Sequence, residues 1–147
     1  MAMDDRRLGP ADATRLAESP KGPVTHCITV DAAVADLDVT SGDNVQLMLI
    51  PAGCIILAVS ARVETIEDSV LTVDVGLYIE STDAEVDKDG FLDGFNGAVA
   101  GVKMTNAEAY ANHAIPVTAG WNLCATYNNA ADKSKIHYFI TLVEHYD

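Results

Sequence analysis

From Val24 onward, apolar and polar side chains alternate along much of the chain. Alternate residues of a β-strand share one face, so this spacing predicts strands with one buried side. The clearest stretch is 71–80, whose odd-numbered residues are all leucine, valine or isoleucine. The stretch 136–146 also alternates, but both of its faces are fairly apolar, which favours a central strand. Further strands are predicted at 24–30, 45–50, 54–64 and 121–127, and weaker ones at 36–39 and 113–117.

Short segments rich in Gly, Pro, Asn and Asp separate these stretches, which is typical of tight turns between strands. They lie at 41–44, 51–53, 67–69 and 128–132. The longest interruption of the strand pattern runs from 81 to 112, and within it Thr105 to Glu108 has the spacing of a helix capping box. Many short strands at this rhythm predict an all-β sandwich or barrel.

The first 23 residues lack the alternation and are interrupted by three X-Pro steps, at Pro10, Pro20 and Pro23. We therefore expect an extended N-terminal arm over 1–23 and one folded domain over 24–147, a length usual for a single domain. Arginine pairs well with carboxylates, so the arm holds candidate residues for docking on a neighbouring protein. These interface candidates are Arg6, Arg7, Leu8 and Arg15. The alternative is a disordered tail.

Charge and composition exclude several classes of partner. Nine basic residues against 22 acidic ones give a formal net charge of −13, which repels nucleic acids and anionic membranes. No apolar stretch approaches the roughly 20 residues that a membrane-spanning helix needs, and no secretory signal is visible. Cys27, Cys54 and Cys124 are odd in number and widely spaced, so we expect reduced thiols in the core.

The sequence offers no convincing catalytic group. His26 and Cys27 are neighbours, but neighbours on a strand face opposite sides of the sheet. His113, His137 and His145 are scattered, and no spacing presents two imidazoles to one zinc ion. The nucleophile elbow, the P-loop and the dinucleotide-binding glycine motif are all absent. We therefore expect a protein that is not an enzyme.

An acidic segment resembles part of an EF-hand calcium loop. If Glu85 occupies position 1, then Asp87, Asp89 and Asp93 fall at positions 3, 5 and 9, and Asp83 lies just before the loop. Position 12 is an asparagine where an EF-hand has a bidentate glutamate, and the flanks do not predict helices. The candidate metal ligands are Glu85, Asp87, Asp89 and Asp93, and calcium is the only cofactor considered. The alternative is a solvated turn.

Three segments resemble small structural proteins of tailed bacteriophages. Residues 41–56, Ser-Gly-Asp-Asn-Val-Gln-Leu-Met-Leu-Ile-Pro-Ala-Gly-Cys-Ile-Ile, are similar to a G-D-x-[VI]-x-L-x-x-[IL]-P-A-G-x-x-[IV] segment of that group. Residues 71–76 are similar to its L-T-x-x-x-G strand, which is followed by an aspartate-rich stretch, and 119–127 resembles an A-G-x-x-x-x-x-x-Y strand. The resemblance implies a jelly-roll-like antiparallel β-sandwich that decorates the phage head as a cement protein, commonly as a trimer.

Together, these features predict a virion structural protein that binds and bridges major capsid subunits on the head surface. It would be made in the host cytoplasm and act as a homo-oligomer, with a trimer favoured and with neither nucleic acid nor membrane as a partner. One alternative is a neck, tail or fibre component of the virion, because a sandwich fold does not dictate its place. Another is a calcium-dependent module that binds surface glycans.

Overall fold

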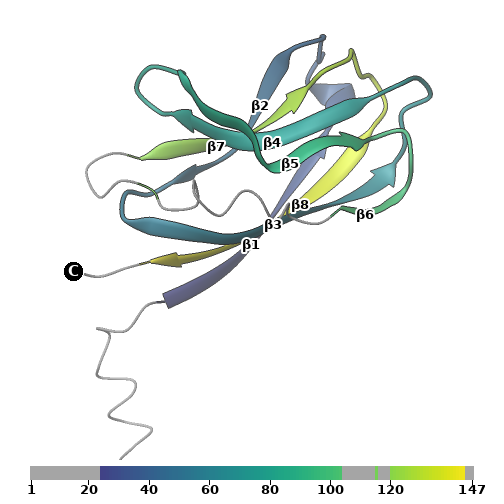
Figure 1. The fold of residues 1–147 in the computed structure, drawn as a ribbon. Helices are drawn as coiled ribbons and strands as arrows, with labels where there is room; N and C mark the ends of the chain where they lie inside the picture. Colours follow the sequence, from purple (N-terminus) through teal and green to yellow (C-terminus); the bar gives the residue numbers. More distant parts are fainter. Residues whose placement is uncertain (1–23, 104–114, 116–119, 145–147) are drawn as a thin grey trace, which may run out of the picture.

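The computed structural model describes residues 24–103, 115 and 120–144, which form strands joined by short loops (Figure 1). The strands are β1 (Val24–Ala33), β2 (Asp43–Ile50), β3 (Cys54–Thr65), β4 (Thr72–Ile79), β5 (Glu85–Asn96), β6 (Gly101–Lys103), β7 (Trp121–Tyr127) and β8 (Lys135–Glu144). A 3-10 helix, η1 (Val34–Asp36), follows β1 directly. No helix in the described ranges is long and apolar enough to cross a membrane.

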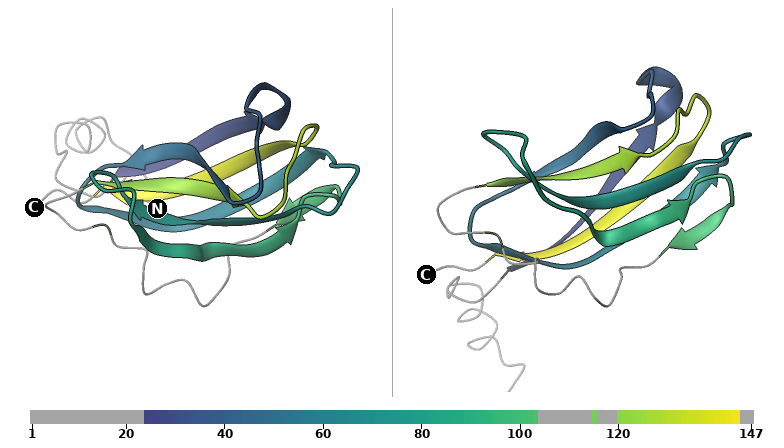
Figure 2. Two further views of the ribbon diagram at one scale, coloured as in Figure 1. Left: turned by 90° about the horizontal axis from the view of Figure 1, so that it is seen from above. Right: turned by 45° about the horizontal axis from the view of Figure 1, so that its top comes forward.

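The strands form two four-stranded sheets that lie one over the other (Figures 1 and 2). One sheet has the order β1-β8-β3-β6 and the other the order β2-β7-β4-β5, and all neighbouring strands are antiparallel. The chain changes sheet at every connection except the β4–β5 turn, so most paired strands are distant in sequence. The predicted all-β antiparallel sandwich is confirmed, and its winding is jelly-roll-like.

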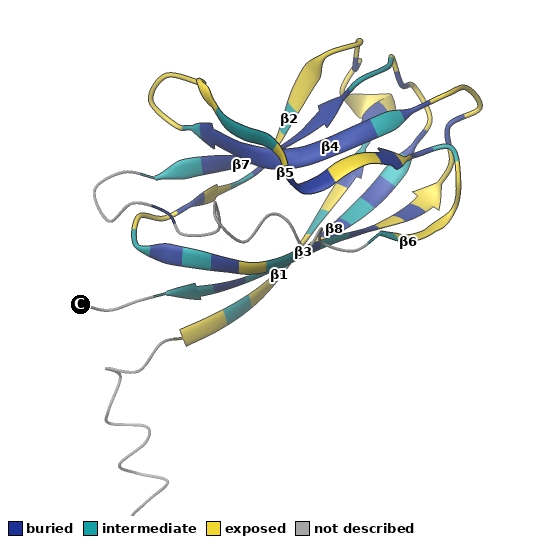
Figure 3. Cartoon of the chain, viewed as in Figure 1, coloured by how far each residue is buried: buried dark blue, intermediate teal, exposed yellow. Residues whose placement is uncertain are grey.

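The core lies between the sheets, where the alternating apolar residues of both sheets meet (Figure 3). Val75 of β4 and Ile140 of β8 are typical members, each with almost no exposed surface. Two contacts join the sheets directly: the hydroxyls of Tyr127 and Tyr138 are hydrogen-bonded at 3.1 Å, and the Phe95 ring packs edge-on against Tyr138. As predicted, β8 is a central strand, between β1 and β3.

The expected interruption over 81–112 is wrong, because this range contains β5 and β6. Period two fails as a signal in β5 because the strand bulges, which places the consecutive residues Phe91 and Leu92 both in the core. The weak strand expected at 36–39 is also absent. Asp36 ends η1, and Val39 forms only an isolated bridge with Ala131.

The cysteines follow the expectation only in part. Cys54 and Cys124 are buried free thiols, as predicted. Cys27 is exposed, because it lies on the outer face of β1, a strand at the edge of its sheet. The arm at 1–23 and the capping-box segment at 105–108 lie outside the described residues, as does all but Ile115 of the strand expected at 113–117.

A glycine on β4 makes the bulge of β5 possible. Leu77 pairs with Asp87 and Val75 pairs with Leu92, so Gly76 alone lies opposite residues 88–91. A Cβ atom on Gly76 would lie 1.9 Å from the carbonyl oxygen of Asp87, which is far inside van der Waals contact. The bulge of β5 therefore folds over the outer face of the sheet at Gly76, where β4 has no side chain in the way.

We expect Gly76→Ala to lower the free energy of unfolding by about 3 kcal/mol, because the new methyl group would overlap backbone atoms that cannot rotate away. Gly90→Ala on the facing strand is the matched control, since the three atoms nearest its Cβ would all belong to the carboxylate of Asp87, a movable side chain. Urea denaturation measures both variants. Equal losses would contradict this role for Gly76.

Candidate docking surfaces

The residues with catalytic potential do not form a catalytic group. His26 Nε2 lies 2.8 Å from Glu144 Oε2 at one end of the β1–β8 pair, but both side chains are partly exposed. Cys27 is exposed while His26 is half-buried, so the two neighbours face different surroundings. Within residues 24–103, 115 and 120–144, no three His, Cys, Asp or Glu side chains are grouped to hold a metal ion. His113 and His145 lie outside these ranges.

The acidic segment proposed as a calcium loop lies in β5 rather than in a loop. Glu85 begins the strand, and Asp87 and Asp89 lie in its bulged part. A hydrogen bond with Asp87, together with burial and the charge of Asp93, raises the pKa of Asp89. The Asp87 and Asp89 side chains thus interact with each other in the bulge, and calcium binding stays a prediction.

A buried carboxylate on the outer face of the β2-β7-β4-β5 sheet fixes the bulge in place. Asp74 Oδ1 accepts a hydrogen bond from the Gly94 backbone at 2.6 Å, and its Oδ2 accepts one from the Asn128 amide at 2.9 Å. Lys88 Nζ lies 3.2 Å from the same Oδ2 and donates to Asn128 Oδ1 at 3.0 Å. The hydrogen bond to Asp74 raises the pKa of Lys88. The network therefore joins β4, β5 and the end of β7.

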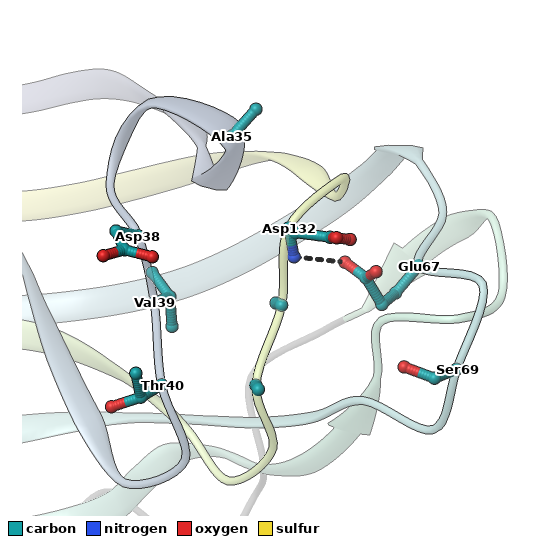
Figure 4. Close-up of a pocket in the computed structure, with 9 residues that line it drawn as sticks. Ala35, Asp38, Val39, Thr40, Glu67, Ser69 and Asp132 are labelled. Carbon is teal, nitrogen blue, oxygen red and sulfur yellow. Dashed lines mark hydrogen bonds between the residues drawn. The ribbon is translucent and has the colours of Figure 1, made fainter.

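Glu67, in the β3–β4 loop, is a buried carboxylate on the wall of a pocket of about 700 Å³ (Figure 4). Its Oε2 accepts backbone hydrogen bonds from Asp132, Lys133 and Ser134 at 3.2, 3.1 and 3.1 Å. Burial alone would raise the pKa of Glu67, but these hydrogen bonds outweigh it and hold the pKa below its usual value. The carboxylate thus ties the β3–β4 loop to the β7–β8 turn, and its role is structural.

The outer face of β1, β8 and β3 carries no charge over three successive rows. The strand register places together the threonine, serine, cysteine and apolar residues that point away from the core. None of them is buried, and Phe139, in the row next to His137, is 39% exposed. We call this surface the neutral face: Thr25, Cys27, Thr29, Ile55, Ala58, Ser60, Phe139, Thr141 and Val143.

A row of charged residues borders the neutral face. His137, next along β8, lies between Asp31 of β1 and Glu64 of β3, with Nδ1 bonded to Asp31 and Nε2 bonded to Glu64. These two hydrogen bonds raise the pKa of His137. Lys135 Nζ lies 3.5 Å from the same Glu64 carboxylate. Charge is therefore concentrated at one end of this sheet surface, where the exposed Arg62 of β3 also pairs with His137 in the strand register.

The interface residues predicted from the sequence, Arg6, Arg7, Leu8 and Arg15, lie outside the described residues. The neutral face was not among the surfaces expected from the sequence, although the sequence contains a signal for it. The outward residues of 136–146 are mostly apolar or threonine, and the same holds for the outward residues of 24–30. Only the strand pairing brings these two stretches side by side.

Glu67→Ala should lower the free energy of unfolding by about 3 kcal/mol, because three backbone N–H groups would lose a charged acceptor. Because the pKa of Glu67 is lowered on folding, this stabilisation is fully present above about pH 4.5 and disappears as the pH falls through the folded pKa. The difference between wild type and variant in urea denaturation should therefore shrink in acid.

Asp68→Ala is the matched control for Glu67→Ala, since Asp68 is an exposed neighbour paired only with the exposed Lys133. We expect it to change stability by less than about 1 kcal/mol. A loss in Asp68→Ala as large as that in Glu67→Ala would contradict the structural role of Glu67, and so would a difference that does not depend on pH.

The chain resembles several solved structures in its fold. No protein-family model matches the chain, and no curated protein matches it. Among solved structures, a chain from the capsid of Ralstonia phage GP4 aligns with a TM-score of 0.64 and 14% identity, covering 84% of this chain and 86% of that one. A chain from the acidic stable capsid of Helicobacter pylori bacteriophage KHP30 aligns with a TM-score of 0.57 and 16% identity, over 83% and 91% of the two chains.

A third likeness is to a chain from the capsid asymmetric unit of cyanophage Pam1, with a TM-score of 0.58, 10% identity and coverage of 84% and 86%. At such low identities these likenesses concern the arrangement of the backbone. The chain has the fold of proteins found in phage capsids.

Proposed function

We propose that this protein is a structural component of a phage virion that decorates the outside of the head and cements neighbouring major capsid subunits. The observation that carries the proposal is the shared fold, which extends over most of both chains in three phage capsid structures. The role requires a stable body and a docking surface and needs no chemistry. It agrees with the order of phage-like segments at 41–56, 71–76 and 119–127.

The lengths of the matched chains favour a small accessory component. Each alignment covers nearly equal shares of the two chains, so the matched chains are close to this one in size. The described part of this chain contains one sandwich and one core. A body of this kind suits attachment to a shell that larger subunits have already closed.

Net charge favours a place on the outer surface. A shell-forming subunit exposes one face to packaged DNA, and a chain of charge −13 would repel that polyanion. On the outside, the same charge keeps unattached copies soluble and apart. A docking surface without carboxylates would avoid the cost of burying unpaired negative charge.

The neutral face meets this requirement, and we propose that it docks on the major capsid subunits. It is uncharged, and Phe139, on the central strand β8, offers a large exposed apolar group. Burying such a surface costs no desolvation of charge, whereas burying an unpaired carboxylate would cost several kcal/mol. Many copies, each with a modest interface, would together hold neighbouring subunits against internal pressure. We expect a symmetric oligomer, with a trimer favoured.

A neck, tail or fibre component is the alternative within the virion. Its copy number per particle would be that of a ring or a fibre, whereas a decoration protein is present in numbers comparable with the shell subunit. Quantifying the chain against the major capsid protein in purified particles distinguishes the two places.

Phe139→Glu should weaken binding to heads by at least about tenfold, because the new carboxylate would be buried without a partner in the interface. The measurement is co-sedimentation of the purified protein with heads of its own phage from which the protein has been stripped. Thr29→Glu, on an exposed neighbouring position of the same row, should have a similar effect.

Val70→Glu is the matched control, since Val70 is 74% exposed in the β3–β4 loop and lies outside the neutral face. It adds the same charge and should leave head binding unchanged. The circular dichroism spectrum and melting temperature of each variant establish that the fold is intact. Wild-type binding by both Phe139→Glu and Thr29→Glu would exclude the neutral face as the docking surface.

A further inference from the structure

In the part of the chain that the structure describes, the two sheets have four edge strands, and three of these edges are protected. β6 has only three residues, the register of β2 shifts between Gln46 and Met48, and β5 combines its bulge with three aspartates. Short strands, bulges and charged residues are the usual means by which a sheet edge avoids pairing with a further strand. These three edges are therefore poor sites for a strand from another molecule.

β1, the fourth edge strand, has none of these protections (Figure 1). Its ten residues pair with β8 in one unbroken register, without a bulge. Residues 24–30 contain no proline, glycine, lysine or carboxylate, and five of the seven are β-branched. β-branched residues favour the extended conformation, so this segment is well suited to accept a further strand.

Every second residue of β1 directs its backbone N–H and C=O groups away from β8. Val34, the residue after β1, donates its N–H to the Ser134 carbonyl at 3.0 Å, in line with the register of the β1–β8 pair. Hydrogen-bonded and non-hydrogen-bonded pairs alternate in an antiparallel ladder, so the even-numbered residues of β1 are the ones bonded to β8. The backbone groups of Thr25, Cys27 and Thr29 therefore point to the free edge, and all three residues are exposed.

β2 limits the open part of this edge. A cavity of about 310 Å³ lies between the end of β1, from Val30 onward, and the segment of β2 from Val45 to Leu47. A strand added to β1 would meet β2 at this end, so the edge open to pairing runs over 24–30. The midpoint of 24–30 is Cys27, which is one of the residues with outward backbone groups.

A second copy of this chain is the partner that fits the open edge. It brings a strand of the same length and composition, and pairing around a two-fold axis satisfies both edges at once. The net charge of −13 opposes contact between copies, but 24–30 carries no carboxylate. Thr25, Cys27 and Thr29 belong to the neutral face, so the pairing would join the neutral faces of two copies into one surface.

We propose that β1 pairs with β1 of a second copy, antiparallel and centred on Cys27. Cys27 then lies opposite the partner's Cys27, and Thr25 lies opposite the partner's Thr29. In each such pair the two residues exchange both N–H···O bonds. With the neutral face docked on capsid subunits, one dimer would span two neighbours, but the pairing itself rests only on the strand edge. Its two-fold symmetry differs from that of the trimer implied by the resemblance, so the mass in solution decides between them.

The first test is the mass of the free, reduced full chain by sedimentation equilibrium. At about 100 μM the chain should be a dimer, since small interfaces bind in the micromolar range. Cys27→Pro should weaken dimerisation at least about tenfold, because it removes the N–H at the centre of the pair in both copies. Proline is tolerated on an edge strand where the N–H faces solvent, so the dilute variant should melt near the wild-type temperature. Cys27→Val is the matched control, since it keeps the N–H and should dimerise like wild type.

The second test is oxidative cross-linking with copper phenanthroline in air. Cys27 is exposed, whereas Cys54 and Cys124 are buried, so only Cys27 is available to a second copy. At the centre of the pair the two Cα atoms would be about 5.5 Å apart, a distance that a disulfide spans, and wild type should form a linked dimer. The matched control combines Cys27→Ser with Thr25→Cys, which moves the thiol along the same exposed edge. Its two Cα atoms would be about 14 Å apart, so it should cross-link at least about tenfold more slowly.

A monomer or a trimer at this concentration would overturn the proposal. A dimer would also overturn it if both thiol positions cross-link equally, or if Cys27→Pro dimerises like wild type. None of these measurements uses phage heads, so a failure of the pairing is distinct from a failure of the docking role of the neutral face.

Discussion

The two sheets hold each other through a single apolar layer, in which Tyr138 contacts both Tyr127 and Phe95 across the sandwich. Each strand must turn its apolar side toward this layer, because the sandwich has no other place to bury it. The side chains on the inner faces therefore form the core and stabilise the fold. Everything that can meet a partner lies on the outer faces, in the loops at the two ends, or in segments beyond the sandwich.

The two outer faces have become different kinds of surface. The β1-β8-β3 surface carries uncharged side chains over three rows and confines its charge to the row around His137. On the opposite sheet, polar residues such as Asp74 and Thr126 are buried and hydrogen-bonded, and the bulge of β5 folds over this face at Gly76. One face is uncharged over three rows, and the other is a polar layer with its own hydrogen-bond network.

The class of fold was accessible from the sequence because period-two alternation is a local signal. It is strongest in 71–80 and 136–146, which became β4 and the central strand β8. It failed in β5, where the bulge puts Phe91 and Leu92 together in the core. The candidate surfaces depend on strand pairing between distant segments, such as β1 with β8, and pairing of that kind leaves no trace in either segment alone.

The jelly-roll-like winding also fixes the distance between the two outer surfaces. Stacked sheets are separated by about 10 Å, and neither sheet can slide or tilt without disrupting the side chains between them. The body of the protein is thus a rigid spacer. A group held on the β2-β7-β4-β5 side would stand at one set height above whatever the other side touches, and every copy on a symmetric shell would present it at that same height.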